Sequence, residues 1–142
     1  MHIPYSNNQN NPLFEENNKT VPLVYFNIIK LKKGESYSYL LKDHETSVVP
    51  ATGVVEISVD GKKLGQIGTR VSDVWDGEPE GSYIPINSPC TITCISDSTE
   101  CFIAGGIYDK KLEPFLVEKK EIDVVQYGSD DTKTHRKIKH IL

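Results

Sequence analysis

The sequence predicts an all-β domain with few or no helices, and three observations support this prediction. No window of about 11 residues shows the apolar spacing of an amphipathic helix. Polar and apolar residues instead alternate in short segments such as residues 54–59, which is the period of a half-buried strand. The 10 glycines and 8 prolines separate these segments at short intervals, as is typical of sandwiches and barrels.

The expected strands follow one another along a β domain of residues 21–127, and 142 residues in total is the size of one domain. Asp60 and Gly61 tolerate positive φ, so they predict a tight hairpin turn. Strands are predicted at residues 21–29, 37–41, 54–59, 82–86, 91–95 and 101–108, with two further candidates at 115–117 and 122–127.

The two ends of the chain differ in composition from this β domain. Residues 1–20 form an Asn-rich arm with little apolar area, which is either loose or becomes ordered as a strand against another surface. Residues 128–142 form a basic C-terminal tail that is expected to be solvated. Its cations are Lys133, Arg136, Lys137 and Lys139.

Charge and hydropathy exclude several classes of function. Sixteen Lys and Arg against twenty Asp and Glu give a net charge of -4, which argues against a nucleic-acid partner because phosphate binding needs clustered cations. No apolar run approaches the roughly 18 residues of a membrane span, so no membrane partner is expected. The first twenty residues lack the apolar region of a signal peptide, and we therefore expect a cytoplasmic protein.

The three cysteines, Cys90, Cys94 and Cys101, are expected to be free, buried thiols, because an odd count in a cytoplasmic chain does not describe a disulfide framework. One alternative remains open. A two-residue turn at Asp97 and Ser98 would place Cys94 opposite Cys101 in a hairpin, where a disulfide is conceivable.

Two segments resemble the halves of a cupin signature, namely Gly34 through Glu45 to Gly53, and Gly81 to Cys90. The stretch 61–79, followed by Tyr-Ile-Pro at 83–85, is similar to the N-terminal cupin half of 5-deoxy-glucuronate isomerases. These are bacterial enzymes of myo-inositol breakdown, related to the ketol isomerases of pectin catabolism. The resemblance covers about residues 34–142, and it implies a single cupin-like jelly roll, also called a double-stranded β-helix.

The resemblance also locates the positions where a cupin binds its metal, and most of the ligands are missing there. Tyr39 and Leu41 stand in place of the two histidines of the first half, and Cys90 stands in place of the histidine of the second half. Asn87 replaces the glycine of that half, and only Glu45 matches. Leucine has no donor atom, and a tyrosine is protonated near neutral pH. We therefore predict no metal and no other cofactor in this domain.

The first functional hypothesis is that the chain is an aldose–ketose isomerase, an intramolecular oxidoreductase, that acts on a deoxy-uronate in carbohydrate or inositol catabolism. Glu45 would be the base that moves a proton between adjacent carbons, and Arg70 would hold the substrate carboxylate as a bidentate fork. Arg70 is expected at the start of a strand that ends in Trp75. Trp75 and Tyr83 would line the pocket and stack on the sugar.

Each of these residues also has a purely structural interpretation. Arg70 is then part of a salt bridge, Glu45 is a surface or turn carboxylate, and Trp75 and Tyr83 belong to the core or to an interface. The polar segment 42–45 is predicted as a turn in which His44 is solvated.

The second hypothesis is a non-catalytic cupin module, which binds a small acid or sugar or serves in dimerisation only. Both hypotheses share a small acidic sugar or related small molecule as the partner. Both also expect a homodimer, because a jelly roll exposes a sheet edge that the Asn-rich arm is suited to cover. The first hypothesis adds a second cupin chain as a possible source of the metal-binding half.

Overall fold

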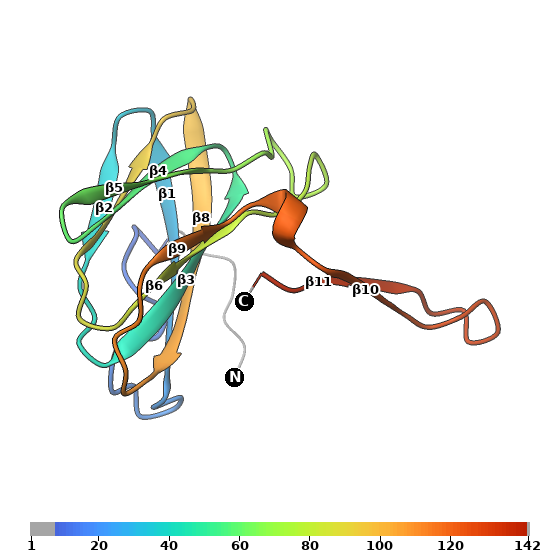
Figure 1. Cartoon of the computed structure of the whole chain (residues 1–142), viewed down its shortest axis with the longest axis horizontal. Helices are drawn as coiled ribbons and strands as arrows, with labels where there is room; N and C mark the ends of the chain where they lie inside the picture. The colour runs from blue at the N-terminus through green and yellow to red at the C-terminus, as the bar shows by residue number, and fades with distance from the viewer. Residues whose placement is uncertain (1–7, 142) are drawn as a thin grey trace.

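Two antiparallel sheets pack face to face in the computed structural model, which describes residues 8–141 (Figure 1). The larger sheet has the order β1-β8-β3-β6-β9, with strands Val24–Lys32, Ser98–Ile107, His44–Thr52, Gly81–Ile84 and Phe115–Val117. The smaller sheet has the order β2-β7-β4-β5, with strands Ser36–Tyr39, Cys90–Cys94, Val55–Val59 and Lys62–Ile67. The only helix among the described residues is the 3-10 turn η1, Lys119–Glu121. The predicted all-β jelly-roll class is confirmed.

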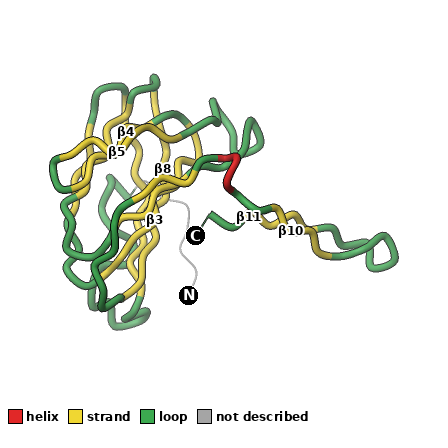
Figure 2. The backbone as a smooth tube through the Cα atoms, in the orientation of Figure 1, coloured by secondary structure: helices red, strands yellow, loops and turns green. Residues whose placement is uncertain are grey.

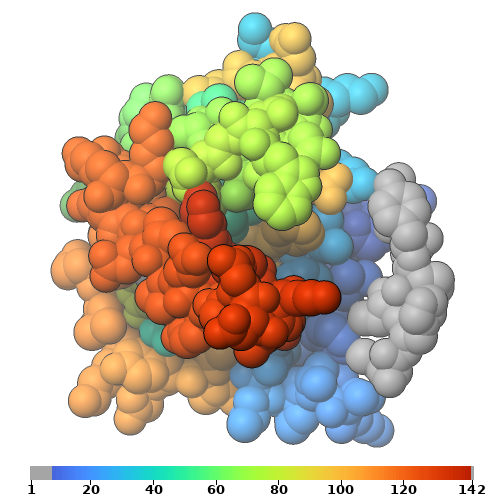
Figure 3. Space-filling model, turned by 90° about the vertical axis from the view of Figure 1, so that its right-hand side faces the viewer, coloured from blue at the N-terminus to red at the C-terminus, as the bar shows by residue number. Residues whose placement is uncertain are grey.

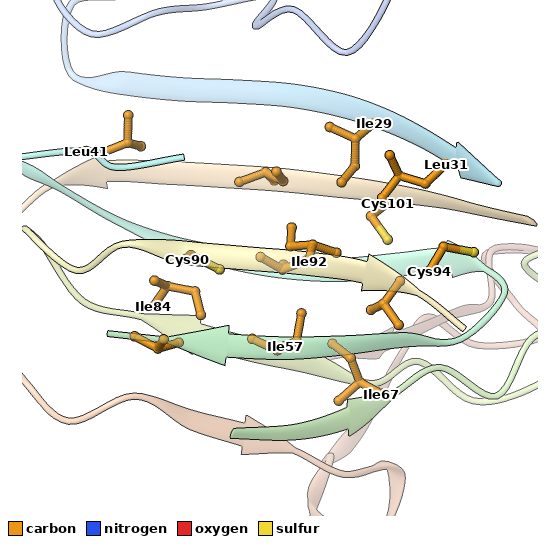
Figure 4. Packing of buried hydrophobic residues seen from close by; sticks show 14 of the residues in the cluster. Ile29, Leu31, Leu41, Ile57, Ile67, Ile84, Cys90, Ile92, Cys94 and Cys101 are labelled. Atoms are coloured by element: carbon orange, nitrogen blue, oxygen red, sulfur yellow. The ribbon is translucent and has the colours of Figure 1, made fainter. Parts of the chain in front are cut away.

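The core lies between the two sheets because the strands alternate in burial along their length. In β4, for example, Val55, Ile57 and Val59 are buried, whereas Glu56 and Ser58 are only partly buried. Alternate side chains of a strand point to opposite faces of its sheet, so each sheet directs one apolar row inward (Figure 4). Residues fully withdrawn from solvent in this core are Ile29, Val48, Val55, Ile57, Ile92, Cys101 and Ile103.

The predicted hairpin turn at Asp60 and Gly61 is confirmed. Both residues have positive φ, 51° and 74°, and they connect β4 to β5 with Val59 paired to Lys62. Positive φ at both central positions gives a turn whose twist matches that of the flanking strands.

Strand β3 was not among the predicted strands, and the prediction of a solvated His44 is wrong. The strand begins at His44, which pairs with Ile107 of β8 and is 3% exposed. The polar residues 44–47 form a strand because β8 and β6 supply backbone partners on its two sides. These partners lie more than 30 residues away in the chain, so local composition does not indicate them.

The conceivable hairpin that would pair Cys94 with Cys101 does not exist. Cys94 lies on β7 of the smaller sheet and pairs with Val55, whereas Cys101 lies on β8 of the larger sheet and pairs with Ile29. All three cysteines are free and buried, so the prediction of free thiols is confirmed.

The described part of the Asn-rich arm, residues 8–20, lies against the edge strand β1 of its own chain. The side chain of Asn10 accepts a hydrogen bond from the Lys30 amide at 2.7 Å and donates one to the Lys30 carbonyl at 3.2 Å. Phe14 forms a β-bridge with Phe26. An edge strand presents unpaired backbone groups, and the arm satisfies part of that edge within the same molecule. Residues 1–7 of the predicted arm lie outside the described residues.

The C-terminal segment forms a two-stranded ribbon that projects from the sandwich (Figures 1 and 2). Its strands are β10, Val124–Tyr127, and β11, Arg136–Lys139. The tail expected over residues 128–142 therefore contains a strand, although its basic side chains are mostly exposed as expected. Ile141 packs against Gly81 in β6 of the larger sheet. The contact is so close that a Cβ atom added to Gly81 would lie 2.5 Å from the Ile141 Cγ2 atom. No helix in the described part of the chain is long and apolar enough to span a membrane.

Candidate functional site

The interior of the jelly roll lies between the two sheets, where a cupin would hold its metal. In this chain it is filled by protonated and apolar side chains. Tyr39 pairs with Cys90 across β2 and β7, and its hydroxyl lies 2.7 Å from the Thr46 hydroxyl. Burial raises the pKa of the Cys90 thiol to about 12 and raises the pKa of Tyr39 well above its ordinary value. Neither is therefore an anionic ligand near neutral pH. Leu41 is buried beside them in the core.

Glu45, the one matching cupin position, faces away from this interior. Along β3 the residues His44 and Thr46 are buried between the sheets, so Glu45 lies on the outward face of the larger sheet. Within residues 8–141, no three His, Cys, Asp or Glu side chains are grouped so that they could hold a metal ion. The residues of the interior do not fit a metal.

Glu45 instead lines a pocket on the outward face, which we call the Glu45 pocket, with a volume of about 490 Å³. The Tyr83 hydroxyl, from β6, donates a hydrogen bond to the Glu45 Oε2 atom at 2.6 Å. Small residues 104–106 of β8 also line the pocket, because side chains this small leave room above the sheet. Its remaining lining residues are Thr46, Ser47, Tyr108, Leu112 and Phe115.

Tyr83 is held firmly and stays a hydrogen-bond donor. Its ring stacks on Phe115 with 5.1 Å between the ring centroids, and its side chain is 7% exposed. Burial, and then the hydrogen bond to Glu45, raises the pKa of the Tyr83 phenol far above its ordinary value of 10.0. The pair therefore presents a half-buried carboxyl group beside a neutral phenol, which is a combination suited to general acid–base work.

Arg70 and Trp75 line a different pocket, which we call the Arg70 pocket, with a volume of about 520 Å³. The expected strand from Arg70 to Trp75 is absent, because residues 68–80 form a loop between β5 and β6. The Arg70 Nε donates to the Gly77 carbonyl at 3.1 Å. Trp75 is 90% exposed, so it does not belong to the core. Lining residues from elsewhere in the chain are Val49, Lys137, Lys139 and Ile141.

The alternative interpretation, in which Arg70 forms a salt bridge, is also not supported. Among residues 8–141, neither Arg70 nor Lys137 takes part in an ion pair, whereas Lys139 pairs with Glu78. Two cations of the Arg70 pocket thus have no carboxylate partner in the described part of the chain.

The four predicted site residues are therefore divided between two pockets on one face. Glu45 and Val49 lie on the same face of β3, and the four steps along the strand from one to the other span about 13 Å. The structure brings Glu45 to Tyr83 and Arg70 to Trp75, but it does not bring the two pairs together. Lys137 and Lys139 were not predicted as site residues. Their alternation around Ile138, typical of a strand with one charged face, was the signal that could have indicated them.

Comparison with known proteins agrees with this architecture. The model of the KduI/IolB family matches residues 2–142. The 5-deoxy-glucuronate isomerases of Bacillus subtilis subsp. natto and Bacillus subtilis strain 168 are each 28% identical over 117 residues, which is 82% of this chain and 42% of the relative. The chain thus spans less than half the length of these curated relatives.

Solved structures show the same fold. An IolB-like protein from Salmonella typhimurium superposes with a TM-score of 0.73 at 22% identity, over 84% of this chain and 44% of that one. A cupin domain from Schizosaccharomyces pombe superposes with a TM-score of 0.50 at 15% identity, over 70% of this chain and 60% of that one. The cupin fold expected from the sequence is confirmed, and the chain belongs to the KduI/IolB family.

Proposed function

We propose that this chain takes part in the aldose–ketose isomerisation of a deoxy-uronate, with the Glu45 pocket as the place of proton transfer. The observation that carries the proposal is the 2.6 Å hydrogen bond between Glu45 and Tyr83 in a pocket on the outward face of the cupin sheet. The names of the Bacillus relatives suggest 5-deoxy-glucuronate as the substrate to test first. Carbohydrate or inositol catabolism in the cytoplasm is the setting that this proposal implies.

The isomerisation requires two groups from the protein, a base and a hydrogen-bond donor. The reaction moves one proton from C2 to C1 and a second from O2 to O1, so no external oxidant or reductant is needed. The Oε1 atom of Glu45, which is not engaged by Tyr83, would take the C2 proton and return it to C1. The neutral Tyr83 hydroxyl would turn to the aldehyde oxygen, stabilise the charge that develops there and give its proton to O1, and it would then take back the proton that leaves O2. No metal or cofactor enters this scheme, because the interior side chains do not fit one.

Proton nuclear magnetic resonance in D₂O tests the proposal. Incubation with 5-deoxy-D-glucuronate should convert the aldose to the ketose with incorporation of solvent deuterium at C1. Glu45→Gln should lower kcat by about 100-fold or more, and Tyr83→Phe by about tenfold, as expected for loss of a general base and of its partner. Glu100→Gln is the matched control, because Glu100 is also a half-buried carboxylate on the outward face of the larger sheet but lies outside the pocket. Conversion that Glu45→Gln leaves unchanged would refute the assignment.

The second candidate function is that of a non-catalytic cupin module, which binds a small acid or sugar without turnover or serves in dimerisation only. The observation that favours it is the division of the predicted residues between two pockets. The Glu45 pocket has no Lys, Arg or His among its described lining residues to pair with a substrate carboxylate. Ligand-induced stabilisation in a thermal melt, without conversion in the resonance assay, would support this candidate.

We also propose that the chain forms a homodimer or a complex with a second cupin chain. The arm residues 8–20 cover β1 within one molecule, so the edges left for a partner strand are β9 in the larger sheet and β2 and β5 in the smaller sheet. Native mass spectrometry of the purified chain, alone and mixed with a second cupin polypeptide, measures which assembly forms. A monomer under all these conditions would refute this part.

A further inference from the structure

We infer that the Arg70 pocket is a binding site, separate from the Glu45 pocket, for a small carboxylate attached to a sugar-like ring. The site lies between the loop of residues 68–80, strand β11 and the outward face of β3. On this side of the molecule the green loop lies next to the dark-red end of the chain (Figure 3). Its volume of about 520 Å³ is that of a small-molecule site, since such pockets span roughly 300–1,000 Å³.

The charges of the pocket select an anion. Arg70, Lys137 and Lys139 are opposed only by Glu78 among the described lining residues, and Glu78 pairs with Lys139. This leaves two uncompensated positive charges in a protein whose net charge is -4. The hydrogen bond from the Arg70 Nε to the Gly77 carbonyl holds the guanidinium group, and its terminal nitrogens have no hydrogen-bond partner within residues 8–141. A guanidinium held in this way suits the two oxygens of a carboxylate.

The apolar part of the pocket selects a ring. Trp75, Val74 and Pro79 from the loop and Val49 and Ile141 from the sheet side form its walls. An aromatic side chain beside a polar anchor is a common arrangement for ring compounds, because the ring face contributes contact area and the charge fixes orientation.

The loop that carries Trp75 is ordered before any ligand arrives. One carboxylate oxygen of Asp76, Oδ2, accepts hydrogen bonds from the Ser72 amide at 2.7 Å, the Ser72 hydroxyl at 3.0 Å and the Asp73 amide at 2.9 Å. These bonds hold the pKa of Asp76 below its usual range. The Trp75 amide in turn donates to the Asp73 carboxylate at 3.0 Å. A platform that is already held in place loses less conformational freedom on binding.

Trp75 is the only tryptophan of the chain, so its fluorescence reports on this pocket directly. The test is a fluorescence titration of the full chain with D-glucuronate, with D-glucose as the neutral ring and acetate as the carboxylate without a ring. Saturable change with D-glucuronate is expected, with binding at least tenfold tighter than that of either control compound. Equal responses to glucuronate and glucose, equal responses to glucuronate and acetate, or no saturation would each overturn the inference.

Two neighbouring residues of β11 provide matched variants. Lys137→Gln removes a cation that lines the pocket, whereas Arg136→Gln removes one that does not, and both change the net charge equally. We expect Lys137→Gln and Arg70→Gln to weaken D-glucuronate binding about tenfold or more, and Arg136→Gln to leave it within about twofold. Equal weakening by Lys137→Gln and Arg136→Gln would overturn the inference. This comparison can be made even if Arg70→Gln fails to fold.

The site does not depend on turnover in the Glu45 pocket. Glu45→Gln should bind D-glucuronate at the Arg70 pocket as the unaltered chain does, whatever the resonance assay shows. Binding that is lost in Glu45→Gln would place the ligand in the Glu45 pocket instead and overturn the inference.

Discussion

The hydrogen bond between Tyr83 and Glu45 should appear as a coupling energy in a double-mutant cycle. The variants are Tyr83→Phe, Glu45→Gln and the two combined, each of which preserves the shape of the side chain. At 2.6 Å the bond has the length of a charge-assisted O–H···O⁻ contact. Such bonds contribute about 1.5–3 kcal/mol when fully withdrawn from water. Glu45 is only half-buried, so we expect a coupling of about 1–2 kcal/mol.

Urea unfolding followed by circular dichroism measures this coupling for the four proteins of the cycle. The control is the cycle of Lys30→Gln and Glu100→Gln, since that ion pair of 3.1 Å lies on the same sheet with side chains 38% and 35% exposed. Exposed pairs of this kind contribute about 0–1 kcal/mol. A Tyr83–Glu45 coupling below about 0.3 kcal/mol would refute the reasoning, because it would mean that water satisfies both groups equally well when they are apart.

Three further predictions concern the core. In native protein at pH 8 the three cysteines should react with a thiol reagent only on unfolding, because all are buried and burial raises the pKa of Cys90 to about 12. Ile57→Ala should lower the free energy of unfolding by about 2–5 kcal/mol in urea, since Ile57 is fully buried. Stability should fall as the pH rises above about 10 in alkaline unfolding followed by circular dichroism. Burial raises the pKa of Tyr25, so only the unfolded chain releases that proton there.

Each of these three has a result that would contradict it. Labelling of any thiol within seconds in native protein would show that the core opens readily. A loss below about 1 kcal/mol for Ile57→Ala would mean that the core closes around the missing atoms, and the exposed Leu23→Ala serves as the reference, with an expected change within about 0.5 kcal/mol. A stability that is flat from pH 9 to 11 would contradict the effect assigned to Tyr25.

His44 is a buried polar residue that is expected to lower the free energy of unfolding. Both of its ring nitrogens are buried without a hydrogen-bond partner in the described part of the chain, and Nδ1 lies 3.8 Å from the Glu16 carboxylate. A buried group that lacks partners costs stability. We therefore expect His44→Leu to leave the free energy of unfolding within about 1 kcal/mol of the original value or to raise it. A loss above about 2 kcal/mol in urea unfolding would show that His44 has a stabilising partner.

Several elements could be predicted because their causes are local. Alternation over residues 54–59 and the positive-φ pair Asp60 and Gly61 specify the hairpin of β4 and β5 without help from distant residues. Once β3 is formed, alternation places His44 and Glu45 on its opposite faces, with His44 buried and Glu45 only partly buried.

Other features depend on partners far along the chain. The polar start of β3 forms a strand because β8 and β6 bind it on both sides. The Arg70 pocket combines residue 49, a loop at 68–80 and β11, and Lys137 lies 67 positions after Arg70. No local pattern encodes such distances, so composition alone described residues 128–142 only as a basic tail.

The sequence by itself determined the all-β class, the family and the free thiols, because alternation, turn chemistry and motif identity are properties of short segments. It also indicated four of the residues that line the two pockets, Glu45, Arg70, Trp75 and Tyr83, but as members of a single site. Only the tertiary structure decided that Glu45 points out of the barrel and meets Tyr83, and that Arg70 and Trp75 join Lys137 elsewhere on the same face. The physical reason is that which face of a strand meets the core, and which loop packs over it, follow from the pairing and stacking of whole sheets.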